Sequence, residues 1–234
     1  MEPSDNKVPK HVGIILDGNR RFSKKLMLKP WMGHELGEKK VEKLLEWCKE
    51  FEINELTLYA FSIQNFNRPK EEFDYLMRLF YGSFERIKED PRIKDVKINF
   101  IGRISMFPEK VRNSMNELMD KTKDNNPYTI NFAMAYGGQE EVIDAVKKIS
   151  ELVKSNKLDI SRINEESFRD FLYLKGSPEL IIRTGGEKRT SNFLNYQAAY
   201  SEWIYLEKLW PEFEKEDFIE CLKEYSKRQR RFGG

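Results

Sequence analysis

Short apolar runs alternate with longer amphipathic segments along most of the chain. The first run, residues 12–16, is rich in β-branched side chains, which is typical of a strand buried on both faces of a sheet. The same criteria predict strands at 12–16, 56–61, 96–101, 128–136, 179–182 and 203–206. Apolar residues at helical spacing predict helices at 34–51, 69–88, 108–123, 139–154, 168–174 and from 215 onward.

This order of elements predicts an α/β fold with a mostly parallel central sheet of about six strands flanked by helices. The chain has no internal repeat, low-complexity linker or change of composition that marks a domain boundary. We therefore expect one domain over residues 1–234, with a polar and flexible segment at 1–10. Ligands bind parallel sheets at the carboxyl ends of the strands, so the loops after the first, second and fifth strands should open on one edge.

A turn with charged residues follows the first strand directly. Asp17-Gly18-Asn19 is a typical turn sequence, and Arg20 and Arg21 come next. Gly18 allows backbone N–H groups to approach a ligand closely, and Asp17 can hold a divalent cation against a phosphate. This stretch therefore predicts a site for a polyanionic phosphate. An ordinary turn with an Asx cap and solvated arginines explains the same residues equally well.

Arginines and small polar residues recur in the other two loops. These are Ser62, Asn65 and Arg68 after the second strand, and Arg183, Arg189 and Ser191 after the fifth. Guanidinium groups bind phosphate oxygens in pairs, and so many on one edge exceed the need of one monophosphate. Two phosphorylated ligands, or diphosphates, fit better, and Asp17, joined by Glu202, is the candidate magnesium site. With 39 acidic residues in the chain, some of these arginines can instead pair with surface carboxylates.

Composition narrows the class of protein. The chain has 234 residues, of which 39% are hydrophobic and 34% charged, and its net charge of +2 gives no global case for nucleic-acid binding. Cys48 and Cys221 lie far apart and are expected to be incidental thiols, and with two histidines they form no zinc motif. The sequence has no signal peptide or membrane span, which makes the cytoplasm the expected location. It also lacks nucleotide-binding loops and a nucleophile elbow, so it indicates diphosphate binding without a nucleotide.

Taken together, these blocks resemble the cis-prenyltransferases, and the resemblance runs from His11 to Gly234. The blocks are residues 11–22 (HVGIILDGNRRF), 33–34 (GH), 56–62 (LTLYAFS), 65–69 (NFNRP), 131–138 (NFAMAYGG), 182–187 (IRTGGE), 189–194 (RTSNFL), 209–211 (LWP) and 230–234 (RRFGG). The resemblance implies a homodimeric transferase with a parallel sheet and an apolar tunnel. It also implies Mg²⁺-dependent, sequential condensation of isopentenyl diphosphate onto an allylic diphosphate such as farnesyl or geranylgeranyl diphosphate. The long-chain polyprenyl diphosphate so formed would be a precursor of glycosyl carrier lipids.

The resemblance implies a role for each matching residue. Asp17 is the catalytic acid at the metal, and Asn65 is the proton acceptor or relay. An amide is a poor base, so Asn65 is better suited to orient a water or a diphosphate oxygen. Glu202 is the second metal ligand. Residues implied in substrate binding are Gly18, Asn19, Arg20, Arg21, Phe22, His34, Ser62, Phe66 and Arg68, with Arg183, Arg189 and Ser191 for isopentenyl diphosphate.

Several positions depart from the family pattern. Pro30 stands where many members have Arg, and the adjacent Lys29 is the candidate replacement for that charge. Lys188 stands where a histidine near the metal is often found, which weakens the case for a third metal ligand. The remaining departures are Arg20 for a small residue, Gln64 for Glu, and Phe22 and Phe66 for Trp.

Two further hypotheses come from other classes of protein. A non-catalytic partner subunit would keep the fold but lose the Asp17 turn or the arginines, and all of these are present. A phosphatase or phosphotransferase would use Asp17 as its nucleophile, but Asn19 stands where a second catalytic aspartate would be needed.

The tunnel wall and the membrane contact are the last expectations. The helical segment 73–84 and the strand residues Ile130, Phe132 and Met134 are candidate walls, although a Phe/Met stripe is more often core. Phe or Met to Ala changes there are expected to lengthen the product, and Asp17→Ala is expected to abolish turnover. The apolar product and the basic tail at 227–231 imply peripheral contact with a membrane surface.

Overall fold

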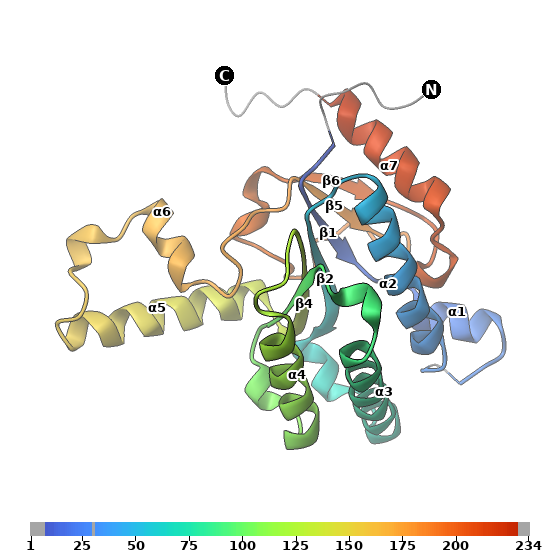
Figure 1. The fold of residues 1–234 in the computed structure, drawn as a ribbon, viewed down its shortest axis with the longest axis horizontal. Helices are drawn as coiled ribbons and strands as arrows, with labels where there is room; N and C mark the ends of the chain where they lie inside the picture. The colour runs from blue at the N-terminus through green and yellow to red at the C-terminus, as the bar shows by residue number, and fades with distance from the viewer. Residues whose placement is uncertain (1–7, 30, 229–234) are drawn as a thin grey trace.

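The computed structural model describes residues 8–29 and 31–228 and contains a six-stranded sheet (Figure 1). The strands are β1 (His11–Ile15), β2 (Glu55–Ser62), β3 (Val96–Ile101), β4 (Tyr128–Tyr136), β5 (Leu180–Arg183) and β6 (Glu202–Tyr205). They lie in the order β3-β4-β2-β1-β5-β6, and neighbouring strands pair in parallel. The predicted single-domain α/β fold with a parallel sheet is confirmed. The expectations for residues 1–7, Pro30 and the tail beyond Arg228 fall outside the described residues.

The helices are α1 (Asn19–Lys25), α2 (Gly33–Glu50), α3 (Lys70–Lys88), α4 (Glu109–Thr122), α5 (Gly138–Lys154), α6 (Glu165–Phe168) and α7 (Lys215–Lys227). Local signals account for their bounds: Pro69 immediately precedes α3, and Glu71 and Glu72 lie in its first turn. The predicted helices 34–51, 69–88, 108–123 and 139–154 are confirmed to within one residue at either end. Within the described residues, no helix is both long and apolar enough to cross a membrane.

The helix predicted at 168–174 is wrong. In the structure α6 begins earlier and passes into a 3₁₀ turn, Arg169–Phe171. The N–H groups of Tyr173 and Leu174 then donate to one carboxylate oxygen of Glu141 on α5, at 2.8 and 3.1 Å. Because these backbone donors are committed to a neighbouring helix, they are not available to extend a helix of their own.

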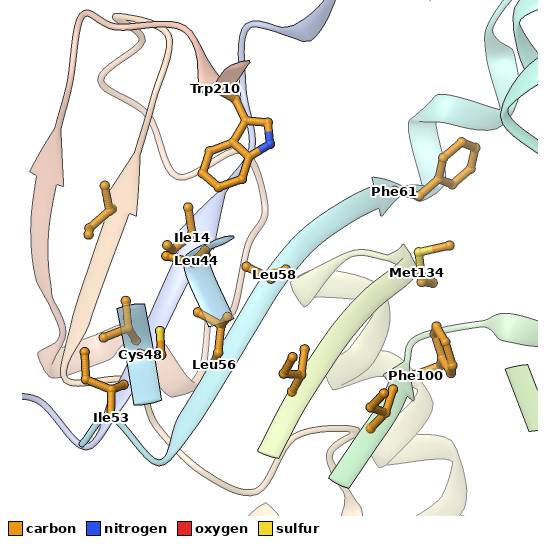
Figure 2. Packing of buried hydrophobic residues seen from close by; sticks show 14 of the residues in the cluster. Ile14, Leu44, Cys48, Ile53, Leu56, Leu58, Phe61, Phe100, Met134 and Trp210 are labelled. Atoms are coloured by element: carbon orange, nitrogen blue, oxygen red, sulfur yellow. The ribbon is translucent and has the colours of Figure 1, made fainter. Parts of the chain in front are cut away.

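The two faces of the sheet are covered unequally. Successive side chains of a strand point to opposite faces, so Ile14 and Ile15 belong to different apolar clusters. Ile14 lies in the larger cluster, to which α2, α3, α4 and α7 contribute; Figure 2 shows Leu44 and Cys48 of α2 beside the strands. Ile15 lies in a smaller cluster with Phe193 from the loop after β5. The helical layer on the first face is thick enough to enclose a cavity.

The carboxyl ends of β2, β1 and β5 meet at the centre of the sheet. Ile15 pairs with Tyr59 on one side and with Arg183 on the other. The loops that follow these three strands therefore open on the same edge, as the sequence predicted. At the left of Figure 1, α5 and α6 project away from the sheet.

Candidate active site

The turn after β1 fixes Asp17 through its backbone. The Asp17 carbonyl accepts hydrogen bonds from the Trp210 N–H at 2.9 Å and from Thr184 Oγ1 at 2.8 Å. Gly18 has φ = 113°, and a Cβ added there would lie 2.8 Å from the Cβ of Leu209, so only glycine fits. Segments distant in sequence thus hold the Asp17 carboxylate at the edge of the sheet.

The Asp17 carboxylate joins two arginines. Its Oδ1 lies 3.1 Å from Arg21 Nη2, and its Oδ2 lies 2.9 Å from Arg183 Nη2. The buried Arg183 also donates through Nη1 to Ser191 Oγ at 2.6 Å and to the carbonyl of Arg189. The structure therefore brings together four of the residues expected at the site, Asp17, Arg21, Arg183 and Ser191, from two separate parts of the chain. The Nε–H of Arg183 has no hydrogen-bond partner within the described residues.

A second carboxylate, which the sequence analysis used only as a helix-start signal, organises the other side of the site. Glu72 is 1% exposed, and its Oε1 lies 2.9 Å from Arg68 Nη1, 3.7 Å from Arg20 Nε and 3.8 Å from His34 Nε2. Contact with His34 and the two guanidinium groups lowers the pKa of Glu72. Arg68 lies in extended backbone before α3, so helical spacing does not predict its contact with Glu72.

The environment of His34 favours its neutral form. Burial lowers its pKa from the usual 6.5, and the nearby Arg68 acts in the same direction, while Glu72 partly opposes the shift. Arg68 Nη1 lies 3.3 Å from His34 Nε2, so Nε2 is the acceptor and the ring proton is on Nδ1. His34 therefore helps to orient Arg68.

A polar pocket of about 350 Å³ lies above these groups. It is lined by Leu16, Asp17, Gly18, Asn19, Arg20, Arg21, His34 and Arg68. Three guanidinium groups and a single carboxylate face this small volume. Forked cationic donors at this density suit an anion with many oxygens, such as a diphosphate.

An apolar cavity of about 330 Å³ shares several residues with the polar pocket, Asp17 among them. It extends between the sheet and the helices α2 and α3, and its apolar lining is Ile15, Leu16, Val41, Tyr59, Ala60, Phe61, Leu76, Leu79, Phe80, Phe84, Ile87, Phe132, Met134 and Trp210. Leu76 and Ile87 are eleven residues apart on α3, which corresponds to about 16 Å of helix. The site thus combines a cationic head pocket with an apolar channel.

The predicted tunnel wall is confirmed in part. Phe80 and Phe84 of α3 and Phe132 and Met134 of β4 line the cavity. Phe73 and Ile130 are not among the described residues that line it; both belong to the surrounding apolar core.

The loop after β2 contributes polar groups to the cavity. Ser62 and Asn65 both line it, and Asn65 Oδ1 accepts a hydrogen bond from the Ser62 N–H at 3.0 Å. A backbone N–H needs an acceptor, so this contact commits the amide oxygen and leaves Nδ2 as a donor. Neither expected aromatic, Phe22 or Phe66, is among the described residues lining the two pockets. Phe66 instead stacks edge-on against Phe61, with 5.1 Å between ring centroids.

Residues 188–191 of the loop after β5 lie open to solvent. Gly185 has φ = 90°, and a Cβ added there would lie 2.4 Å from Arg21 Nη2, so glycine permits the close approach of this loop to the Asp17 turn. The side chain of Arg189 is exposed and pairs with Glu187 at 2.5 Å. Lys188 is also exposed. These cations are accessible to a second anionic ligand.

Glu202 does not join Asp17 within one chain. In the parallel ladder Glu202 pairs with Leu180, which pairs with Val12, so it lies at the amino ends of the strands. Its Oε2 is 2.7 Å from Arg228 Nη1. This register places the two carboxylates at opposite edges of the sheet, so they do not share a metal ion within one chain; the role of Glu202 as a second metal ligand stays a prediction.

A magnesium ion fits the remaining donors only together with a phosphate ligand. No group of three or more metal-binding side chains occurs in the part of the chain that the structure describes. Mg²⁺ usually takes one or two carboxylates, several waters and the oxygens of a bound phosphate. Asp17 lines both the polar pocket and the cavity, and therefore supplies the one carboxylate that such an ion needs.

The chain is similar to proteins of known class over nearly its whole length. Residues 15–233 match the family model described as "Putative undecaprenyl diphosphate synthase". The chain is 49% identical over 230 residues to a tritrans,polycis-undecaprenyl-diphosphate synthase (geranylgeranyl-diphosphate specific) of Pyrococcus horikoshii, covering 97% of this chain and 87% of the relative. A protein of the same name from Methanocaldococcus jannaschii is 44% identical over 234 residues, covering 97% and 84%.

Two solved structures have the same fold. Lavandulyl diphosphate synthase from Lavandula x intermedia, in complex with dimethylallyl diphosphate, superimposes with a TM-score of 0.91 and 32% identity, covering 97% of this chain and 99% of that one. A probable undecaprenyl diphosphate synthase from Campylobacter jejuni gives a TM-score of 0.82 and 33% identity, covering 98% and 100%.

Proposed function

The chain belongs to the undecaprenyl diphosphate synthase family of cis-prenyltransferases and is a prenyl-group transferase, and we propose that it condenses isopentenyl diphosphate sequentially onto an allylic diphosphate. The proposed primer is geranylgeranyl diphosphate, the specificity named for the relatives. The proposed product is a long-chain polyprenyl diphosphate with new cis double bonds, made as the precursor of a glycosyl carrier lipid.

One observation carries this proposal: Asp17 lines both the cationic pocket and the apolar cavity. An allylic diphosphate has an anionic head joined directly to an apolar chain. The cationic pocket suits the head, and the adjoining apolar cavity suits the chain. The head group would contact Arg20, Arg21 and Arg68 in the pocket, and the chain would extend along α3 toward Phe84.

Bond making and breaking would occur where the two spaces meet. The allylic C–O bond breaks, its electron pair leaves with the diphosphate, and the guanidinium groups stabilise the developing negative charge. The allylic carbon bonds to the terminal alkene carbon of isopentenyl diphosphate, which loses a proton to form the new double bond. Asn65, whose oxygen is engaged by the Ser62 N–H, would donate through Nδ2 and orient a water or diphosphate oxygen that takes this proton.

Isopentenyl diphosphate would be held from the β5 side. Arg183 lies between Asp17 and Ser191, and the exposed Arg189 lies on the same loop. Holding both substrates in one orientation removes much of the entropic cost of their encounter. Mg²⁺, held by Asp17 and diphosphate oxygens, would supply further stabilisation of the leaving group.

A homodimer is part of the proposal. Ile143 and Val146 are exposed on α5, the helix that projects from the sheet (Figure 1). Apolar side chains on a projecting helix suit a contact with a second copy. Light scattering should give twice the monomer mass for the purified chain, and Ile143→Lys should lower that mass; a monomeric wild-type protein would refute this part.

The reaction is tested by incubating the purified chain with labelled isopentenyl diphosphate, Mg²⁺, and either farnesyl or geranylgeranyl diphosphate. Growth of labelled prenyl diphosphates, resolved by chromatography, supports the proposal, and higher kcat/KM with geranylgeranyl diphosphate supports the named primer. Phosphate release without chain growth would indicate a phosphatase. Absence of turnover would indicate a non-catalytic subunit.

A further inference from the structure

The connection between α1 and α2 exposes an unusual concentration of apolar side chains. Ten large hydrophobic side chains are exposed among the described residues, and five of them lie between positions 26 and 36. They are Leu26, Met27, Leu28, Met32 and Leu36, of which Met27 is 96% exposed. Single exposed apolar residues need no explanation, but a cluster of this kind marks an interaction surface.

The structure holds this connection in a defined protruding form. Ser23 Oγ accepts a hydrogen bond from the Gly33 N–H at 2.6 Å, which ties the start of α2 to α1. The Leu28 N–H donates to the Ser23 carbonyl at 2.9 Å. Met27 has φ = 56°, a conformation that non-glycine residues adopt uncommonly. These hydrogen bonds hold the base of a protruding segment whose tip is Leu26, Met27 and Leu28. We call this segment the knob.

Basic residues flank the tip in the sequence. Residues 20–34 contain five Arg or Lys and no Asp or Glu. Three of these cations have carboxylate partners: Arg20, Arg21 and Lys25, the last with Glu212 at 2.5 Å. Within the described residues, Lys24 and Lys29 have no carboxylate partner, and Lys29 Nζ lies 5.4 Å from the ring centroid of Trp31.

We infer that this knob docks the protein on the surface of an anionic lipid bilayer, with Leu26, Met27 and Leu28 entering the boundary of the acyl chains. Apolar side chains flanked by lysines match the layered chemistry of such a surface, where hydrocarbon lies below phosphate. A second copy of the chain is a poorer occupant, because two identical basic knobs repel each other.

The position of the knob relates this membrane contact to the proposed reaction. The knob connects directly to the residues around Asn19 and His34, which line both the head pocket and the cavity. Docking would therefore hold the site beside the bilayer that receives the long-chain product. This relation rests on the proposed function, whereas the docking itself rests on the geometry of the knob.

The last described residues do not belong to this surface. Arg228, the last described residue, is bound to Glu202 at the amino edge of the sheet and also contacts Glu224. In Figure 1 the end of α7 lies at the top of the molecule, and the α1–α2 connection lies at its right-hand side. The expectation of membrane contact through the tail stays a prediction, and the knob is a separate site for such contact.

Vesicle co-sedimentation tests the inference without any substrate. The full chain is mixed with vesicles of phosphatidylcholine alone or with phosphatidylglycerol. We expect binding to the anionic vesicles that weakens with salt, and at least about tenfold weaker binding by the triple variant Leu26→Ser, Met27→Ser, Leu28→Ser, since burial of one such side chain supplies about that factor. The matched control, Met106→Ser with Ile160→Ser, removes exposed apolar groups elsewhere and should bind like wild type.

A fluorescent label locates the contact. Cys48 and Cys221 are buried, so a thiol-reactive, environment-sensitive dye should modify Met27→Cys selectively. Its emission should shift to the blue only with anionic vesicles, and the same label on Ile160→Cys should not shift. Equal binding by wild type and the triple variant, or a blue shift that depends on protein concentration without lipid, would overturn the inference. Because these readouts need no turnover, their failure is distinguishable from failure of the proposed reaction.

Discussion

Asp17 and Arg183 form an ion pair of 2.9 Å between Oδ2 and Nη2, which joins the turn after β1 to the end of β5. The Arg183 side chain is 4% exposed, whereas that of Asp17 is 28% exposed and borders the head pocket. Asp17 therefore has two separable tasks: it balances a buried cation, and it presents a carboxylate to the ligand.

The two tasks give different results for two substitutions of Asp17. Asp17→Asn keeps an oxygen acceptor for Arg183 and should lower kcat by at least about 100-fold with little loss of stability. Asp17→Ala should also abolish turnover, and it should reduce the free energy of unfolding by up to about 3 kcal/mol because Arg183 also loses its hydrogen-bond acceptor. Steady-state assays and urea unfolding measure the two effects. Wild-type kcat in Asp17→Asn would contradict the assignment.

Glu72 should act on one substrate only. Glu72→Gln removes the charge that positions Arg20 and Arg68, so we expect the KM for the allylic diphosphate to rise about tenfold. The KM for isopentenyl diphosphate should change little, because Arg183 and Ser191 have no contact with Glu72. Glu71→Gln alters an exposed neighbour on the same turn and is the matched control. An equal rise in both KM values would refute this division.

Product length should respond to the residues that line the cavity. Phe84→Ala opens space at the end of the lining on α3, so the longest product should gain one or more isoprene units. Phe73→Ala lies outside the lining and should leave the length unchanged. Chromatography of the reaction products measures this difference. The wall assignment fails if both variants give the wild-type distribution, provided that Phe84→Ala is folded by circular dichroism, since such changes can cost about 3–5 kcal/mol.

The two histidines should make stability depend on pH near neutrality. Burial lowers the pKa of both His11 and His34 from the usual 6.5. Below about pH 6.5 the unfolded chain therefore binds more protons than the folded chain, so the free energy of unfolding should fall as the pH falls from about 7.5 to 5.5. The carboxylates with lowered pKa values, such as Glu72, contribute only below this window.

Urea unfolding at a series of pH values measures this slope. The double variant His11→Gln, His34→Gln should show a flatter dependence over the same range. An unchanged slope in the double variant would assign the dependence to other groups.

The sequence by itself determined the elements and their order. The β-branched run before Asp17 and the helical spacing in 34–51 are local patterns, and parallel connection follows from the alternation of strands and helices. Because parallel strands place their carboxyl ends on one edge, the convergence of Asp17, Arg68 and Arg183 also followed from the order of elements. The motifs further identified the family, which the comparisons bear out.

Only the tertiary structure decided which side chains meet. Glu72 became the organiser of the head pocket because the start of α3 buries it beside α1 and α2, and its local sequence marks only a helix start. Glu202 lies opposite Leu180 rather than near Asp17, and that register depends on the pairing of β5 with β6. The helix predicted at 168–174 ends early, and Glu141 accepts the N–H groups of Tyr173 and Leu174. In each case the deciding partner is distant along the chain, and local sequence patterns carry no information about such contacts.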